Sequence, residues 1–109
     1  MSRSSAFVTT CFEGFHCWPD APEAVGFLRD KHRHVFHVRV DVSVSHSDRD
    51  VEFILFKQQL DKDIQSIAEE RDTSTWSCES WCEAILDTYP SAIRVEVSED
   101  NENGAVVQR

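Results

Sequence analysis

Residues 33–44 alternate between two kinds of side chain, and this alternation constrains the fold more than any other feature of the sequence. One set is mostly apolar: His34, Phe36, Val38, Val40, Val42 and Val44. The other set is mostly charged or polar: Arg33, His37, Arg39, Asp41 and Ser43. Because successive side chains of a strand point to opposite faces, this period of two predicts one long strand that is buried on a single face.

Three other segments are typical of strands. Residues 6–15 are rich in β-branched and aromatic types, and a polar loop with Pro19 and Pro22 separates them from the long strand. In residues 93–98 an apolar side chain alternates with a polar one, starting at Ile93, and residues 105–107 predict a short fourth strand.

Two helices are expected between the second and third strands. The first follows Asp48 and Asp50, which are candidate N-caps, and its apolar stripe is Phe53, Phe56, Leu60, Ile64 and Ile67. The second begins near Ser77 with Glu79 in its first turn and ends at Pro90. Its apolar stripe is Cys78, Trp81, Cys82, Ile85, Leu86 and Tyr89. The order ββααββ predicts an α+β fold, a four-stranded antiparallel sheet with two helices on one face.

Length and charge limit the classes of function. The chain has 109 residues, which predicts a single domain over residues 1–109. Twenty acidic residues against eleven basic ones leave a net charge of −9. This balance argues against nucleic acid and anionic membranes as partners, because both recruit clustered Lys and Arg. With no apolar signal core near the start, we expect a cytoplasmic protein.

The four cysteines are consistent with a reducing compartment. None forms a Cys-x-x-Cys pair, and Cys78 and Cys82 are spaced to share one helix face. We expect free thiols, with these two buried as small apolar side chains rather than used for metal or redox chemistry.

Homo-oligomerisation is expected from the sheet itself. One face of the long strand carries Arg33, His37, Arg39 and Asp41, which is too polar for an ordinary core, and the sheet edges are unpaired. Edge-to-edge assembly of subunits into a closed barrel would pair the sheet edges and would give the polar face an environment other than an apolar core.

Three histidines are candidates for a metal site. His32 and His34 project from the same face of the long strand, and His16 ends the first strand. Three neutral imidazoles with an open position form a catalytic type of zinc site. The alternative is that they are ordinary surface or core histidines, which is how we interpret His37 and His46.

Glu99 is the candidate ligand-binding carboxylate. It follows Val95 and Val97 at the same parity, where an apolar residue is expected. A partly buried carboxylate needs N–H donors, which a guanine-like or pterin-like edge would supply. The alternative is a solvated strand end within an acidic run.

Five motifs resemble the 6-pyruvoyl-tetrahydropterin synthase and 6-carboxytetrahydropterin synthase family, which has the tunnelling fold. They occur in the family's order across nearly the whole chain: Phe12-Glu-Gly-Phe-His16, His32-Arg-His-Val-Phe36, Glu52-Phe-Ile-Leu-Phe-Lys57, Trp76-Ser-Cys-Glu79-Ser-Trp81 and Glu99-Asp100. The resemblance implies zinc held by His16, His32 and His34, and Glu99 as the anchor of the bound ligand. It also implies a ring or double ring, here from trimer to hexamer, with each pocket at a subunit boundary.

The sequence departs from this family where the family's catalysis occurs. Leu28 stands in the place of the catalytic cysteine, and residues 67–76 contain no Asp-His pair. The parent reaction is therefore not expected, and no residue is assigned a catalytic role. Cys17, directly after His16, is a candidate replacement nucleophile or base, but its acidic surroundings would raise a thiol pKa.

Three functions remain open on the sequence. The first is a protein that binds a purine, pterin or nucleotide, with Trp18 and Phe27 able to stack on the ring, although core packing is more usual for a residue like Phe27. The chain also resembles small, acidic bacteriophage-encoded proteins, and this resemblance implies that the bound molecule is a nucleotide signal that the protein sequesters. The second is a zinc-dependent lyase or hydrolase acting on a nucleotide or pterin. The third is an interaction subunit whose histidines only support the fold.

Overall fold

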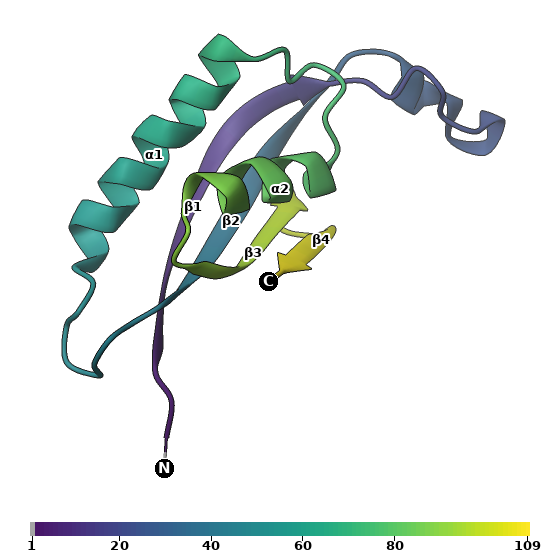
Figure 1. The fold of residues 1–109 in the computed structure, drawn as a ribbon. Helices are drawn as coiled ribbons and strands as arrows, with labels where there is room; N and C mark the ends of the chain where they lie inside the picture. The colour runs from purple at the N-terminus through teal and green to yellow at the C-terminus, as the bar shows by residue number, and fades with distance from the viewer. Residues whose placement is uncertain (1) are drawn as a thin grey trace.

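The computed structural model describes residues 2–109 and consists of one sheet with two long helices packed against it (Figure 1). The elements in chain order are β1 (Ser5–His16), the 3-10 segment η1 (Glu23–Arg29), β2 (His32–Ser43), α1 (Phe53–Glu70), α2 (Cys78–Thr88), β3 (Ala92–Glu99) and β4 (Asn103–Gln108). The expected order of strands and helices is confirmed. The short segment η1, within the expected polar loop, is an addition.

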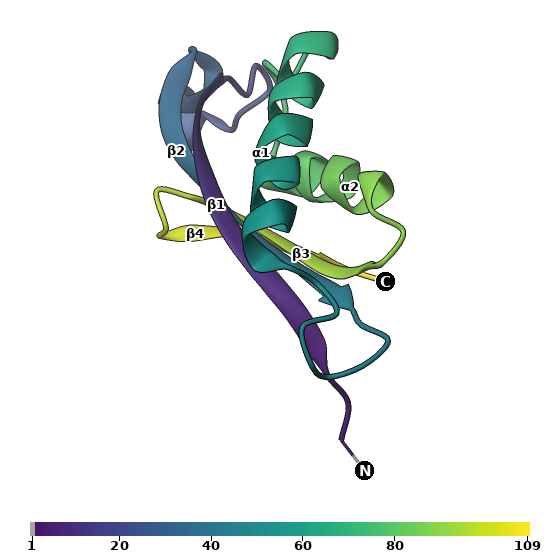
Figure 2. The same ribbon diagram turned by 90° about the vertical axis from the view of Figure 1, so that its left-hand side faces the viewer.

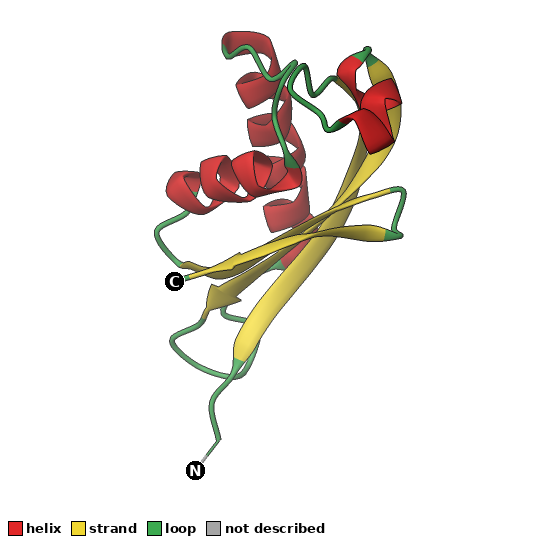
Figure 3. Ribbon diagram, turned by 90° about the vertical axis from the view of Figure 1, so that its right-hand side faces the viewer, coloured by secondary structure: helices red, strands yellow, loops and turns green. Residues whose placement is uncertain are grey.

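The sheet is antiparallel with the strand order β1-β2-β3-β4. β1 and β2 pair over their whole length, from Ser5 opposite Ser43 to His16 opposite His32. Both helices lie on one face of the sheet, with α2 across β3 and β4 and α1 along β1 (Figures 2 and 3). The other face is uncovered by helices. Across the described residues no helix is both long and apolar enough to span a membrane.

The core lies between the sheet and the helices. The buried positions of β2 are Phe36, Val38, Val40 and Val42, as the alternation predicts. Helix α2 contributes Cys78, Trp81, Cys82, Ile85 and Leu86, and α1 contributes Leu60 and Ile64. The two helical cysteines are buried, as expected.

The start of α1 differs from the expectation. Its N-cap is Glu52, whose side chain accepts a hydrogen bond from the backbone N–H of Leu55, so neither Asp48 nor Asp50 is the cap. Asp50 instead accepts bonds from the backbone and hydroxyl of Ser45 and closes the preceding loop. Phe53 consequently lies on the first turn beyond the edge of the core and is 59% exposed. The N-cap of α2 is Ser77, as predicted.

A register shift in β3 explains a second difference. Asp41 pairs with Arg94, but the next residue, Val42, pairs with Ala92. Such a bulge places an extra residue on one strand, so Ile93 is turned out of the core and Ala92 is buried in its place. A period-two pattern alone predicts Ile93 inside.

The hairpin between β3 and β4 is tight. Asp100 and Asn101 both have left-handed backbone conformations, with φ of 55° and 60°, which Asp and Asn tolerate better than most residues. β4 begins at Asn103, earlier than expected, because Gly104 lies close to the backbone of Val97 and Ser98. This hairpin brings the end of β3 toward the start of β2.

Candidate metal centre and adjacent cavity

The strand register brings His16, His32 and His34 together. His16 is the last residue of β1 and lies opposite His32, the first residue of β2, while His34 lies two residues further along the same face. The ring centroids are 4.6, 5.1 and 4.9 Å apart, and one nitrogen from each ring lies within 4.8 Å of the other two. The predicted convergence of these three side chains is confirmed, and they could hold a metal ion.

Each imidazole is oriented by an oxygen on its outer side. The acceptors are the Trp76 carbonyl at 2.7 Å from His16 Nδ1, the Asp30 carbonyl at 2.8 Å from His32 Nδ1, and the Asp100 carboxylate at 2.7 Å from His34 Nδ1. Because carbonyl and carboxylate oxygens only accept, each Nδ1 is the donor, and in the neutral ring each Nε2 carries a lone pair. Metal-binding histidines characteristically show this outer hydrogen bond.

Glu99 lies against two of these nitrogens. Its Oε2 is 3.1 Å from Nε2 of His16 and 3.3 Å from Nε2 of His34. The side chain is 27% exposed, so the carboxylate is half-buried at the end of β3 rather than fully solvated. The nearest neighbours of this carboxylate are therefore imidazole Nε2 atoms of the protein itself.

A cation would stabilise the charges in this cluster. Two neutral imidazoles with protons on Nδ1 would direct two lone pairs at an anionic oxygen, which is repulsive at these distances. A metal ion between the three atoms, or protons on the Nε2 atoms, removes the repulsion. The arrangement is thus built around positive charge.

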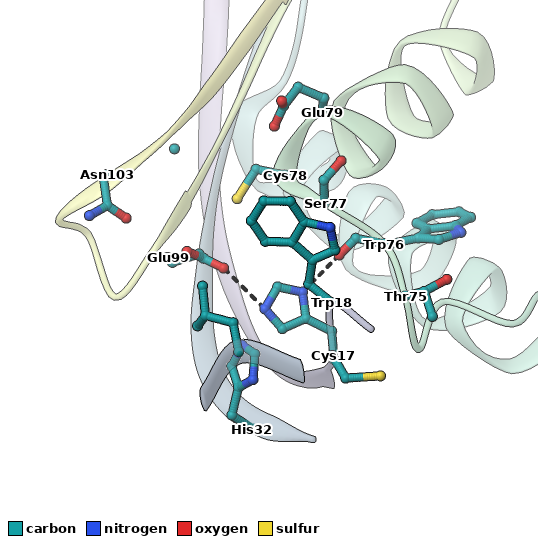
Figure 4. Close-up of a pocket in the computed structure, with 13 residues that line it drawn as sticks. Cys17, Trp18, His32, Thr75, Trp76, Ser77, Cys78, Glu79, Glu99 and Asn103 are labelled. Carbon is teal, nitrogen blue, oxygen red and sulfur yellow. Dashed lines mark hydrogen bonds and ion pairs between the residues drawn. The ribbon is translucent and has the colours of Figure 1, made fainter. Parts of the chain in front are cut away.

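A cavity of about 540 Å³ adjoins the histidines (Figure 4). Its lining residues are His16, Cys17, Trp18, Leu28, His32, residues 75–79, Glu99, Asn103 and Gly104. It is large enough for a small heterocyclic ligand. Trp18, which is 50% exposed, lies on the cavity wall with Glu99 facing it (Figure 4).

Phe27 is placed differently from Trp18. It lies in η1, is 71% exposed, and is neither part of the core nor among the residues that line this cavity. Its exposure is opposite to the core packing that is usual for phenylalanine.

The cavity does not contain an activated thiol at Cys78. Burial, followed by the nearby charge of Glu99, raises the pKa of this thiol to about 12, so it is protonated at neutral pH. Leu28, which stands where the resembled family has its catalytic cysteine, also lines the cavity. Cys17 is the other lining thiol.

Sequence reasoning missed Asp100 and the two carbonyls at Asp30 and Trp76. Asp100 holds both Nδ1 of His34 and the backbone N–H of Val35, the latter at 2.9 Å. Its only signal was its place directly after Glu99, within an acidic run that favours a solvated turn. The contact joins residues far apart in the chain, so local pattern does not reveal it.

No protein-family model matches the chain, and neither does any curated protein. The histidine cluster and the adjacent cavity are the features of the molecule that bear on its function.

Proposed function

We propose that this protein binds zinc through His16, His32 and His34 and holds a flat purine-like or pterin-like molecule in the adjacent cavity, as a divergent relative of the 6-pyruvoyl-tetrahydropterin synthase family. The observation that carries the proposal is the common orientation of the three imidazoles, each donating outward from Nδ1. Three separately placed acceptors are not needed to pack three partly buried histidines, but they are typical of histidines that bind a metal.

The cavity supports the ligand class. Trp18 offers an exposed aromatic face for stacking, and Glu99 offers carboxylate oxygen to the adjacent N–H groups of a guanine-like or pterin-like edge. A nucleotide signal that is bound unchanged is one form of this function.

Binding is favoured over the parent reaction. Leu28 has no proton to exchange, and the high pKa of the Cys78 thiol makes it a poor nucleophile. A zinc-dependent hydrolase or lyase is the second candidate, supported by the nearness of the cavity to His16 and His32.

Assembly into a ring of three to six subunits is part of the proposal. The radius of gyration is 15.3 Å, whereas a compact chain of about 100 residues has roughly 13 Å. The long β1–β2 pair extends beyond the helices (Figure 1), and Phe7, Phe15 and Val106 are exposed on β1 and β4. Packing against further copies would cover these side chains and place each cavity near a subunit boundary.

Native mass spectrometry of the purified protein, followed by calorimetry with guanine nucleotides, cyclic nucleotides and pterins, tests this function. We expect one zinc per subunit and a ligand that is bound without being changed. His32→Ala should abolish stoichiometric zinc, whereas His37→Ala, on the opposite face of the same strand, should retain it. Absence of metal from both native and zinc-reconstituted protein would reject the proposal, and turnover of the bound ligand would favour the enzyme.

A further inference from the structure

The position of Glu99 matches that of a metal ligand. In a tetrahedral zinc site with bonds of about 2.0–2.1 Å, neighbouring ligand atoms lie roughly 3.3 Å apart. Glu99 Oε2 lies 3.1 Å and 3.3 Å from the Nε2 atoms of His16 and His34. A fourth ligand would have one such distance to each of the three histidines. The distances from Glu99 to His16 and to His34 are therefore both suitable.

The direction of the lone pairs supports the same assignment. The outer acceptors of His16 and His34 take up the Nδ1 protons, so the Nε2 atoms of these neutral rings have no proton to give to Glu99. A shared metal ion makes this contact between three electron-pair donors attractive.

We infer that Glu99 is the fourth ligand of the metal, bound through Oε2, so that the site is a closed three-histidine, one-glutamate centre. The inference rests on the proposed metal site and goes beyond it. The group of described residues whose ligand atoms all lie within 4.8 Å of one another is the three histidines, so binding of the ion by Glu99 would need its carboxylate to move toward His32. Its 27% exposure leaves room for such a movement.

A closed centre has a consequence for function. Structural zinc sites have four protein ligands, whereas catalytic sites keep one position for water or substrate. With Oε2 on the metal, Oε1 remains available to accept an N–H group from a molecule in the cavity that Glu99 lines. Glu99 then joins the metal to the ligand, and no metal-bound water is present to attack it.

The test uses Co²⁺ alone as the probe. The wild-type protein should bind one Co²⁺ per subunit, with a visible spectrum that does not change between about pH 6 and 9, because no bound water can ionise. Glu99→Gln should bind Co²⁺ and Zn²⁺ at least about tenfold more weakly in chelator competition, and its spectrum should change with pH as bound water loses a proton. Glu102→Gln, an exposed carboxylate in the same hairpin, is the matched control and should behave as wild type. Thermal melting of each metal-free variant checks that the fold is retained.

The outcomes are distinguishable. Metal binding by wild type with an unchanged affinity and spectrum in Glu99→Gln would overturn the fourth ligand and leave the three-histidine site standing. A wild-type spectrum that itself titrates with pH would overturn the closed centre in the same way. No metal binding by wild type would overturn both proposals, and the cluster would then be a set of protonated histidines paired with Glu99.

Discussion

Asp100 holds His34 from the side opposite to Glu99. The Asp100 carboxylate lies 2.7 Å from Nδ1, while the Glu99 carboxylate lies 3.3 Å from Nε2 of the same ring. The hydrogen bond from His34, followed by that from the backbone of Val35, lowers the pKa of Asp100 below its ordinary value. Two successive residues of one tight hairpin therefore determine both the orientation of the ring and its inner contact.

The first prediction concerns the hydrogen bond between Asp100 and His34. Asp100→Asn should lower zinc affinity by about 10- to 100-fold, because an amide is a weaker acceptor than a carboxylate for the Nδ1 proton and orients the ring less firmly. Chelator competition measures the change. Asp87→Asn, on the exposed side of α2, is the control and should have no effect. An affinity equal to wild type in Asp100→Asn would show that Asp100 does not position His34.

The second prediction concerns the thiols. With a pKa of about 12, roughly one Cys78 thiol in ten thousand is ionised at pH 8. Cys82, whose pKa is raised to about 11 mainly by burial, is similarly protected. Iodoacetamide at pH 8 should label the exposed Cys11 and leave both helical thiols unmodified until denaturant is added, as mass spectrometry of peptides would show. Rapid labelling of Cys78 in the folded protein would contradict its burial.

The same shifts predict the direction of an alkaline effect. Both folded pKa values lie above the ordinary thiol value of 9.0, so the unfolded chain loses these protons first as the pH rises. The stabilisation from the neutral buried thiols is complete below pH 9 and is lost between pH 9 and about 12. Denaturant unfolding at pH 8 and 10 should show a smaller decrease in the Cys78→Ala variant than in wild type.

The third prediction concerns the hairpin. A Cβ atom on Gly104 would lie 2.1 Å from the carbonyl oxygen of Val97 and 2.5 Å from Cα of Ser98, both backbone atoms that cannot easily move. Gly104→Ala should lower the free energy of unfolding by about 1–3 kcal/mol, measured by denaturant titration. Gly26→Ala is the matched control, since its nearest atom would be the flexible end of Arg29 at 3.5 Å. Equal stability of the two variants would contradict the close approach of β3 and β4.

The fourth prediction concerns assembly. Phe7→Asp and Val106→Asp place charge on exposed apolar positions of β1 and β4 and should convert the proposed ring to monomers of 12.5 kDa in light scattering. Gln58→Asp, on the exposed side of α1, should leave the assembly intact. A wild-type protein that is already monomeric at micromolar concentration would reject the ring.

The fifth prediction concerns the reaction of the synthase family that the sequence resembles. Dihydroneopterin triphosphate should be neither dephosphorylated nor rearranged by the zinc-loaded protein, because Leu28 stands where the cysteine is needed. Chromatography of the reaction mixture would detect either product. Formation of one of them would require a different base in the cavity.

Much of the fold could be predicted because its signals are local. The alternation in β2 placed Phe36, Val38, Val40 and Val42 inside, and the capping serine and first-turn glutamate located the start of α2. The true cap of α1 was missed because Asp50 and Glu52 are both acceptable caps, and the choice depends on the bonds that Asp50 makes to Ser45. The bulge at Ile93 was missed because it is a property of two strands together.

The sequence by itself determined that His32 and His34 share a face, since side-chain parity along one strand requires no knowledge of the rest of the molecule. The sequence also showed that Glu99 is a carboxylate at a strand position where the alternation predicts an apolar side chain. Only the tertiary structure decided what these groups contact: the register of β1 against β2 set His16 beside His32, and the β3–β4 hairpin brought Glu99 and Asp100 to opposite sides of His34. The physical reason is that this cluster is defined by distances of a few ångströms between residues as far apart in the chain as His16 and Glu99, and those distances depend on strand pairing and turn geometry rather than on local pattern.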